Sequence, residues 1–202
     1  LGDDAGVAAE LFEVTAAGTF EHGASTLQLL RDPEDVAQWA SIRARLAQAR
    51  DQRPQPGRDD KIVTAWNALT ITALAEAGAG LGRSEWISLA DKVARDIVDR
   101  QVVDGRVRRA SLGGVVGEPG GALEDYAGLA VAMLTLHQAT GFAAWLHEAI
   151  TLLDTAIELF ADPEAPGTWF DVTAETSLIA RPRDPVDNAT PSGAALMAEA
   201  LQ

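Results

Sequence analysis

Apolar residues recur at helical spacing over most of the chain. Trp39 and Ile42 begin this pattern, and Asp32 followed by Pro33 supplies a cap and a first-turn proline. We therefore expect a helix that starts after Asp32 and runs to about Arg50. A linker with two prolines and a glycine follows at 51–58, where helical spacing is lost.

Beyond the linker, the pattern of helices repeats about every sixty residues. The segments 82–86 and 141–145 share the spacing Gly-x-x-x-Trp, and each separates two helical stretches. The first helix of each unit is rich in Ala and Leu with few charges (64–77 and 124–139). The second is more amphipathic (84–100 and 143–160). A long irregular return follows (103–122 and 162–187), and we expect small β pieces at 105–110 and 168–172.

A helix that is apolar nearly all round is buried on most sides, whereas an amphipathic helix covers a core with one face. Alternation of the two predicts an inner ring of helices wrapped by an outer ring. We therefore expect an all-α fold of helical hairpins that form part of an (α/α)6 toroid; a stacked solenoid is the less favoured alternative. The predicted domains are a poorly defined segment, 1–31, and a partial toroid, 32–202, with hairpins at about 59–100 and 123–160 and the start of a third at 188–202.

Composition narrows the function classes. The 202 residues carry a net charge of −14 and no cysteine. The acidity argues against a nucleic-acid partner, and the absence of Cys excludes disulfides and Cys-ligated metals. Three scattered histidines lack metal-ligand spacing, so we expect no metal site and no cofactor. No apolar run is long enough to span a bilayer, so we expect no membrane partner, and we expect a cytoplasmic protein.

Polar motifs fall at or just before the predicted inner helices, which point the same way in a ring. They should gather around one mouth of a central cavity. Paired carboxylates there can act as general acid and base on a sugar, and aromatic rings can stack on it. The predicted catalytic residues are Asp60, Asp125 and Asp187, and the predicted substrate-binding residues are Trp66, Asn67, Glu124, Tyr126, Arg183, Thr190 and Ser192.

A structural interpretation of the same acids is also open. Asp, Ser and Thr at helix starts commonly accept hydrogen bonds from free backbone N–H groups. An enzyme requires Asp60, Asp125 and Asp187 to share a cavity, with carboxyls within about 10 Å. A purely structural role requires each to be bonded to its own helix start.

Four motifs in order carry a resemblance to a known family: RDDKIVTAWN (58–67), LEDYA (123–127), WL (145–146) and NATPSG (188–193). They resemble the C-terminal half of the thioredoxin-domain-containing, or spermatogenesis-associated protein 20, family. The resemblance implies an (α/α)6 toroid similar to N-acylglucosamine 2-epimerases and six-hairpin glycosidases. Because the thioredoxin-like domain is missing from this sequence and the start lacks Met, we expect a fragment.

The resemblance implies a carbohydrate-active scaffold and a carbohydrate ligand. Hydrolysis would use Asp125 and Asp187 as the acid and base, with Asp60 as a third carboxylate and Arg183 available for an acidic substrate group. Epimerisation would be expected to use two histidines, as in the similar epimerases, and here His137 and His147 are not placed to cooperate.

A noncatalytic helical-repeat module, which binds a sugar, a peptide or a partner protein, is the alternative function. A partial ring would also leave apolar flanks uncovered. Large exposed apolar patches drive association, so we expect a homo-oligomer.

Overall fold

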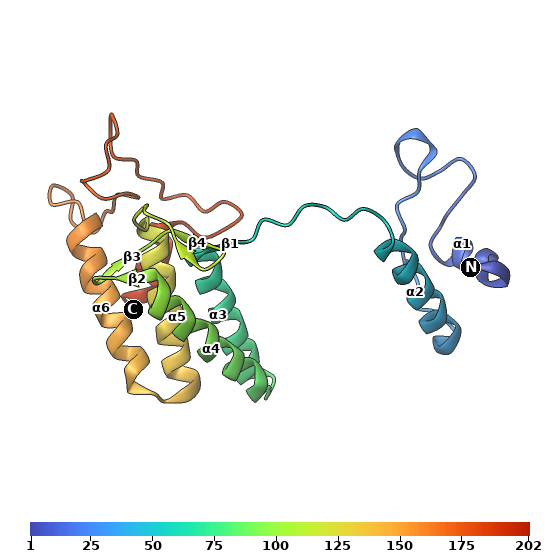
Figure 1. Ribbon diagram of the computed structural model, residues 1–202, viewed down its shortest axis with the longest axis horizontal. Coiled ribbons are helices and arrows are strands. Elements are labelled where there is room, and N and C mark those ends of the chain that lie inside the picture. The colour runs from blue at the N-terminus through green and yellow to red at the C-terminus, as the bar shows by residue number, and fades with distance from the viewer. The chain divides into compact units, whose positions relative to one another are not determined.

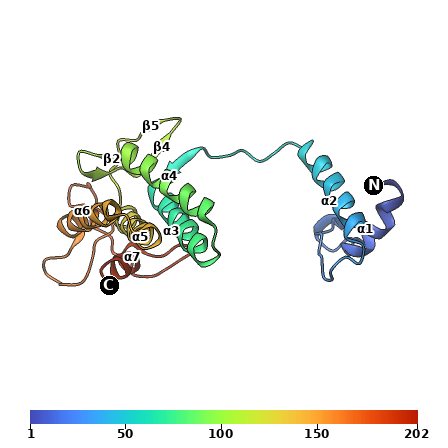
Figure 2. The same ribbon diagram turned by 90° about the horizontal axis from the view of Figure 1, so that it is seen from below.

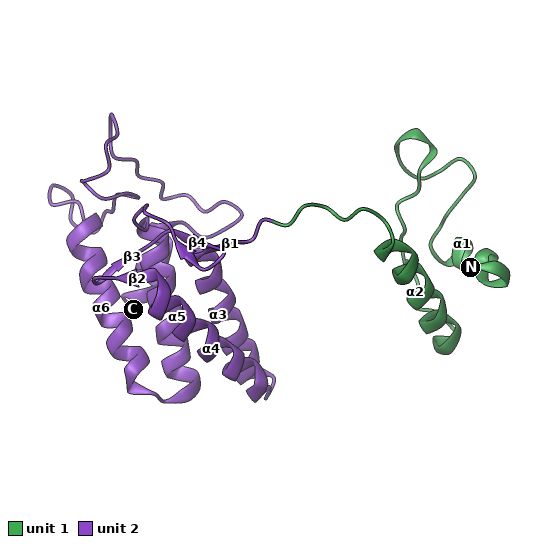
Figure 3. Cartoon of the chain, viewed as in Figure 1, with its two compact units in different colours: residues 1–58 green, residues 59–202 purple.

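The computed structural model describes all 202 residues, which form two compact units, 1–58 and 59–202 (Figure 3). The boundary lies at the end of the linker that the sequence predicts at 51–58. None of the helices is long and apolar enough to cross a membrane.

The first unit contains helices that end at the linker. Its elements are η1 (Gly2–Asp4), α1 (Ala5–Leu11), η2 (Glu21–Gly23) and α2 (Val36–Asp51). Helix α2 starts later than predicted, because Asp35 rather than Asp32 caps it. The Asp35 carboxylate accepts hydrogen bonds from Ala37 N at 3.0 Å and from Gln38 N at 2.9 Å. The predicted cap at Asp32 is therefore wrong, and Pro33 lies outside the helix.

Helix α2 packs on the N-terminal segment of its own unit. Arg45 pairs with Asp4 at 2.9 Å, and the rings of Phe12 and Trp39 lie 5.5 Å apart. These contacts connect α2 to the segment 1–31, which was predicted to lie outside the toroid. The grouping of residues 32–202 as one toroid stays a prediction.

The second unit contains the predicted hairpins (Figure 1). Its helices are α3 (Thr64–Gly80), α4 (Ser84–Gln101), α5 (Leu123–Thr140), α6 (Ala143–Phe160) and α7 (Gly193–Ala200). Its strands are β1 (Lys61–Val63), β2 (Val102–Val103), β3 (Arg106–Val107), β4 (Ala110–Leu112) and β5 (Val115–Val116). The expected all-α class with minor β pieces is confirmed.

Helix α5 forms the centre of this unit. It packs on α3, α6 and α7, and Figure 2 shows it between α3 and α6. Most of its side chains are buried, whereas α4 and α6 bury one face and expose the other. The apolar helices α3, α5 and α7 are therefore consecutive inner elements, and α4 and α6 cover them.

The strands and the long returns lie over the end of the unit where α3 and α5 begin (Figure 1). Strand β4 pairs antiparallel with β1 and β5, and β2 pairs with β3. The β piece expected at 105–110 is thus present as β3 and the start of β4. The piece expected at 168–172 contributes one isolated bridge, between Trp169 and Ala161, so it forms no strand.

Gly193 marks the closest approach of α7 to α5. A Cβ at this position would lie 2.9 Å from Leu123 Cγ and 3.0 Å from Glu124 N. We expect Gly193→Ala to lower the free energy of unfolding by about 1–3 kcal/mol, because one helix start must move. Urea denaturation measures the effect, with Gly80→Ala as control, because a Cβ at Gly80 meets open space. Equal stability of the two variants would contradict the tight contact.

Candidate functional site

Asp125 ties together the starts of two inner helices. Its Oδ1 accepts a hydrogen bond from Ala65 N at 2.9 Å, and its Oδ2 accepts one from Ala122 N at 2.8 Å. The Arg109 guanidinium donates to the same Oδ2 at 2.9 Å. The side chain is fully buried, and burial raises the pKa of Asp125 against the opposing effects of Arg109 and the two N–H groups. Both carboxyl oxygens are therefore engaged within the protein.

Arg109 extends this network to the neighbouring acid. Its Nη1 also contacts Glu124 Oε1 at 2.5 Å, so one guanidinium nitrogen bridges two carboxylates. Glu124 is partly exposed, unlike Asp125. The arginine thus holds one acid in the core and the other at the surface, at the start of α5.

Glu124 lines a cleft of about 210 Å³ between the starts of α5 and α7 and the return that precedes α7. We call it the carboxylate cleft. Its acids are Glu124, Asp171 and Asp184, and its other polar side chains are Asn188, Thr190 and Ser192.

The surroundings of Asp171 perturb its carboxyl. Burial raises its pKa, and the negative charges of Asp184 and Glu124 raise it further, although a hydrogen bond from the Asp184 backbone opposes them. Asp171 therefore keeps its proton to a higher pH than a free aspartate. A carboxyl of this kind suits proton transfer to a bound ligand.

Three of the predicted substrate-binding residues meet in this cleft: Glu124, Thr190 and Ser192. Ser192 also caps α7, since its Oγ accepts a hydrogen bond from Ala195 N at 3.1 Å. Asp187 Oδ1 accepts a hydrogen bond from Ser192 N at 2.8 Å. Asp187, one of the predicted catalytic acids, therefore holds the loop before α7 in place.

The other predicted residues lie outside the carboxylate cleft. Asp60 is exposed just before β1, and Trp66 is 61% exposed on α3. Asn67 Nδ2 donates to Val63 O at 2.8 Å, near the start of its own helix. Arg183 forms an ion pair with Asp162 and lies over the ring of Phe170. Their predicted roles toward a substrate stay predictions.

Tyr126 is buried, with 2% of its surface exposed. Its ring packs edge-on against Phe160 at 5.3 Å, and its hydroxyl accepts a hydrogen bond from Val107 N at 2.9 Å. The ring face therefore belongs to the core, where a sugar has no room to stack.

Sequence reasoning missed Asp171 and Asp184. Both come from the irregular return, which has no periodicity to indicate which side chains turn inward. Neither the apolar pair Trp169-Phe170 before Asp171 nor Arg183 before Asp184 has a spacing that indicates a shared cleft. In neither unit are three or more His, Asp or Glu side chains grouped so as to hold a metal ion.

Comparisons with known proteins identify relatives of this chain. It is 36% identical over 169 residues to spermatogenesis-associated protein 20 of mouse, a match that covers 78% of this chain and 21% of that protein. The human protein of the same name is 36% identical over 168 residues. The chain thus spans about a fifth of the length of these relatives. No family model matches it.

Among solved structures, the chain is similar to a sugar epimerase from a ruminal bacterium. The TM-score is 0.58 at 15% sequence identity, and the match covers 83% of this chain and 48% of the epimerase. At this identity the likeness establishes the fold, which is that of a mainly α toroid. Taken with the sequence relatives, it confirms the predicted resemblance: the chain belongs to the spermatogenesis-associated protein 20 family.

Proposed function

We propose that unit 59–202 forms part of a carbohydrate-binding site, in which the carboxylate cleft binds sugar hydroxyls and exchanges a proton with the ligand. The observation that carries this proposal is the grouping of Glu124, Asp171 and Asp184 at the starts of α5 and α7, with a raised pKa at Asp171. The fold shared with a sugar epimerase supports the choice of ligand class.

The chemistry of the cleft suits a polyol. Ionised carboxylates accept hydrogen bonds from hydroxyl groups, and Asn188, Thr190 and Ser192 supply groups that both donate and accept. The volume of about 210 Å³ is below the range of about 300–1,000 Å³ typical of drug-sized ligands. A single sugar ring, rather than an extended chain, is the expected occupant.

The general acid of this site is Asp171 rather than Asp125. Both oxygens of Asp125 are occupied by Ala65 N, Ala122 N and Arg109, so a proton could be carried there only by breaking that network. Asp171 lines the cleft and is the carboxyl whose pKa its neighbours raise. Hydrolysis and epimerisation both need such a group, so turnover assays must distinguish the two reactions.

A noncatalytic binding module is the second candidate. It is favoured by the backbone hydrogen bonds of Asp125 and Asp187, two predicted catalytic acids that instead hold helix starts. In this case the carboxylate cleft would bind a sugar without turnover. Product analysis after incubation with each sugar that binds separates the two candidates.

Asp171→Asn tests the carboxylate cleft. We expect the variant to bind monosaccharides at least about tenfold more weakly, because a neutral amide accepts a weaker hydrogen bond from a sugar hydroxyl than a carboxylate does. Calorimetric titration with neutral and acidic monosaccharides measures the affinity. Asp154→Asn is the matched control, since Asp154 is exposed on α6 away from the cleft. Equal affinity in both variants would contradict the proposal.

The same variant has an expected pH signature. Because the folded-state pKa of Asp171 is raised above 3.8, the folded protein loses stability as the pH rises through the window between the unfolded and folded values. Asparagine removes this penalty and can still accept the bond from the Asp184 backbone. Asp171→Asn should therefore be at least as stable as the native chain at pH 7, with the advantage gone below pH 3.8. Thermal melts across this range measure it.

A further inference from the structure

A second and larger cleft lies beside the carboxylate cleft. It has a volume of about 660 Å³ and lies between β3, the segment before α5 and the return at 172–176. Ala122 lines both clefts. Next to it, a hydrogen bond of 2.9 Å from Leu123 N to Asp171 O joins the start of α5 to the return. We call the larger cleft the arginine cleft, because Arg106 and Arg108 line it.

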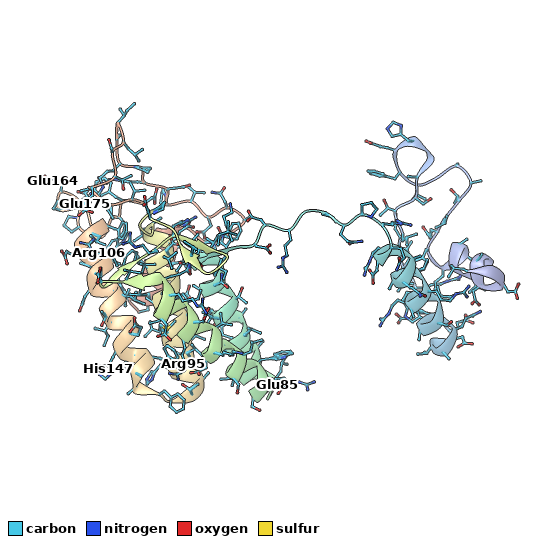
Figure 4. All side chains as sticks on the ribbon, viewed as in Figure 1. Glu85, Arg95, Arg106, His147, Glu164 and Glu175 are labelled. Atoms are coloured by element: carbon cyan, nitrogen blue, oxygen red, sulfur yellow. The ribbon has the colours of Figure 1, made fainter.

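The two arginines have donors to spare. Arg108 Nη1 donates to Glu118 O at 2.8 Å, which uses one of the five N–H groups of its guanidinium. The guanidinium of Arg106 makes no hydrogen bond or ion pair with the rest of the chain, and the residue is half-buried. Figure 4 labels Arg106 near β3 and Glu175 in the return on the same side of the unit. Both guanidinium groups are thus available to a ligand.

Tyr126 adds a third donor at the base of this cleft. Its oxygen already accepts a hydrogen bond from Val107 N, and its own O–H hydrogen has no acceptor in the chain. Burial raises the pKa of Tyr126, although Arg106 and Arg108 act to lower it, so the phenol stays protonated at neutral pH. A protonated phenol beside two guanidinium groups is a set of donors that suits an anion.

Two acids also line the arginine cleft, Glu118 and Glu175. Both are exposed, and neither forms an ion pair with an arginine of the cleft. Solvent screens exposed charges more than half-buried ones. The donors nearest the buried base of the cleft therefore determine which ligand group it accepts.

We propose that the arginine cleft binds the anionic group of a sugar whose ring occupies the carboxylate cleft, so that the ligands of this site are acidic sugars. The oxyanion is either the carboxylate of a uronic acid or the phosphate of a sugar phosphate, because guanidinium groups and a phenol recognise both. This inference rests on the proposed function, from which it takes the position of the sugar ring.

Calorimetric titrations test the inference with four probes: glucose, glucuronate, glucose 6-phosphate and inorganic phosphate. The proteins are the native chain and two variants. Arg106→Gln changes the cleft, and the control Arg43→Gln removes the same charge from an exposed arginine of the first unit. We expect at least one acidic sugar to bind about tenfold or more tightly than glucose. Arg106→Gln should remove this preference, and Arg43→Gln should keep it. The comparison of glucuronate with glucose 6-phosphate identifies the anion.

The remaining outcomes separate this inference from the proposed function. If glucose binds as tightly as both acidic sugars, and Arg106→Gln changes none of the affinities, the anion site is overturned while the sugar site stands. If no sugar binds but inorganic phosphate does, and Arg106→Gln abolishes that binding, the arginine cleft is an anion site, and both the proposed sugar function and the acidic-sugar inference fail. If neither sugars nor phosphate bind, both are overturned.

Discussion

Asp125→Ala is expected to lower the free energy of unfolding by about 3–5 kcal/mol, the cost of removing one partner from a buried charged network. The change leaves Ala65 N and Ala122 N without their acceptor and removes one of the two carboxylates that Arg109 contacts. The starts of α3 and α5 would lose their shared contact. Urea denaturation followed by circular dichroism measures the loss.

Asp187→Ala is the matched control for this prediction. Asp187 is exposed and accepts a single backbone hydrogen bond, from Ser192 N. Its loss should cost only about 0.5–1.5 kcal/mol. If the two alanine variants were equally stable, Asp125 would not be the tie between the inner helices. Asp125→Asn provides a folded variant if alanine prevents folding, because one amide oxygen can still accept from Ala65 N or Ala122 N.

The helices could be predicted because their patterns are local. Gly-x-x-x-Trp at 82–86 and 141–145 marks the turns between α3 and α4 and between α5 and α6, and both hairpins are present. The contrast between apolar and amphipathic helices correctly separated α5, which is buried, from α6, which exposes one face. Period and burial are properties that neighbouring residues share, so one sequence is enough to recognise them.

The chemistry at the helix starts could be predicted only in part. Glu124 and Asp125 are adjacent in sequence, yet one faces the carboxylate cleft and the other is buried between α3 and α5. Arg109, a residue from the segment between β3 and β4 that has no helical period, contacts both acids, and Asp125 also accepts from Ala65 N of α3. The surroundings of Asp171 are also tertiary, because its charged neighbours Asp184 and Glu124 lie far from it in the sequence. Pairings of this kind are tertiary and leave no local signal.

The expectation of a homo-oligomer stays a prediction. An apolar groove of about 400 Å³ on α3, lined by Leu69, Ala73 and Leu74 together with Trp86 of α4, is the kind of uncovered flank on which the expectation was based. Light scattering of the chain in solution tests it. A monomer at micromolar concentration would contradict it.

Phe160→Ala is the second change with a large expected effect. The Phe160 ring is fully buried and supports the edge of Tyr126 at 5.3 Å. Removal of a buried phenylalanine ring costs about 3–5 kcal/mol, because a cavity remains. Chemical denaturation should detect this loss. Phe142→Ala is the control, since Phe142 is 56% exposed at the turn before α6, and it should change stability by less than about 0.5 kcal/mol.

Phe160 also links stability to the arginine cleft. Its ring supports one side of Tyr126, so a smaller residue at position 160 loosens the Tyr126 ring and with it the hydroxyl that accepts from Val107 N. Phe160→Leu leaves a smaller cavity than alanine and is expected to fold. If Tyr126 donates to a bound anion, this variant should bind the acidic sugar more weakly while its affinity for glucose is unchanged. An unchanged preference for the acidic sugar would show that the support of the Tyr126 ring by Phe160 does not affect anion binding.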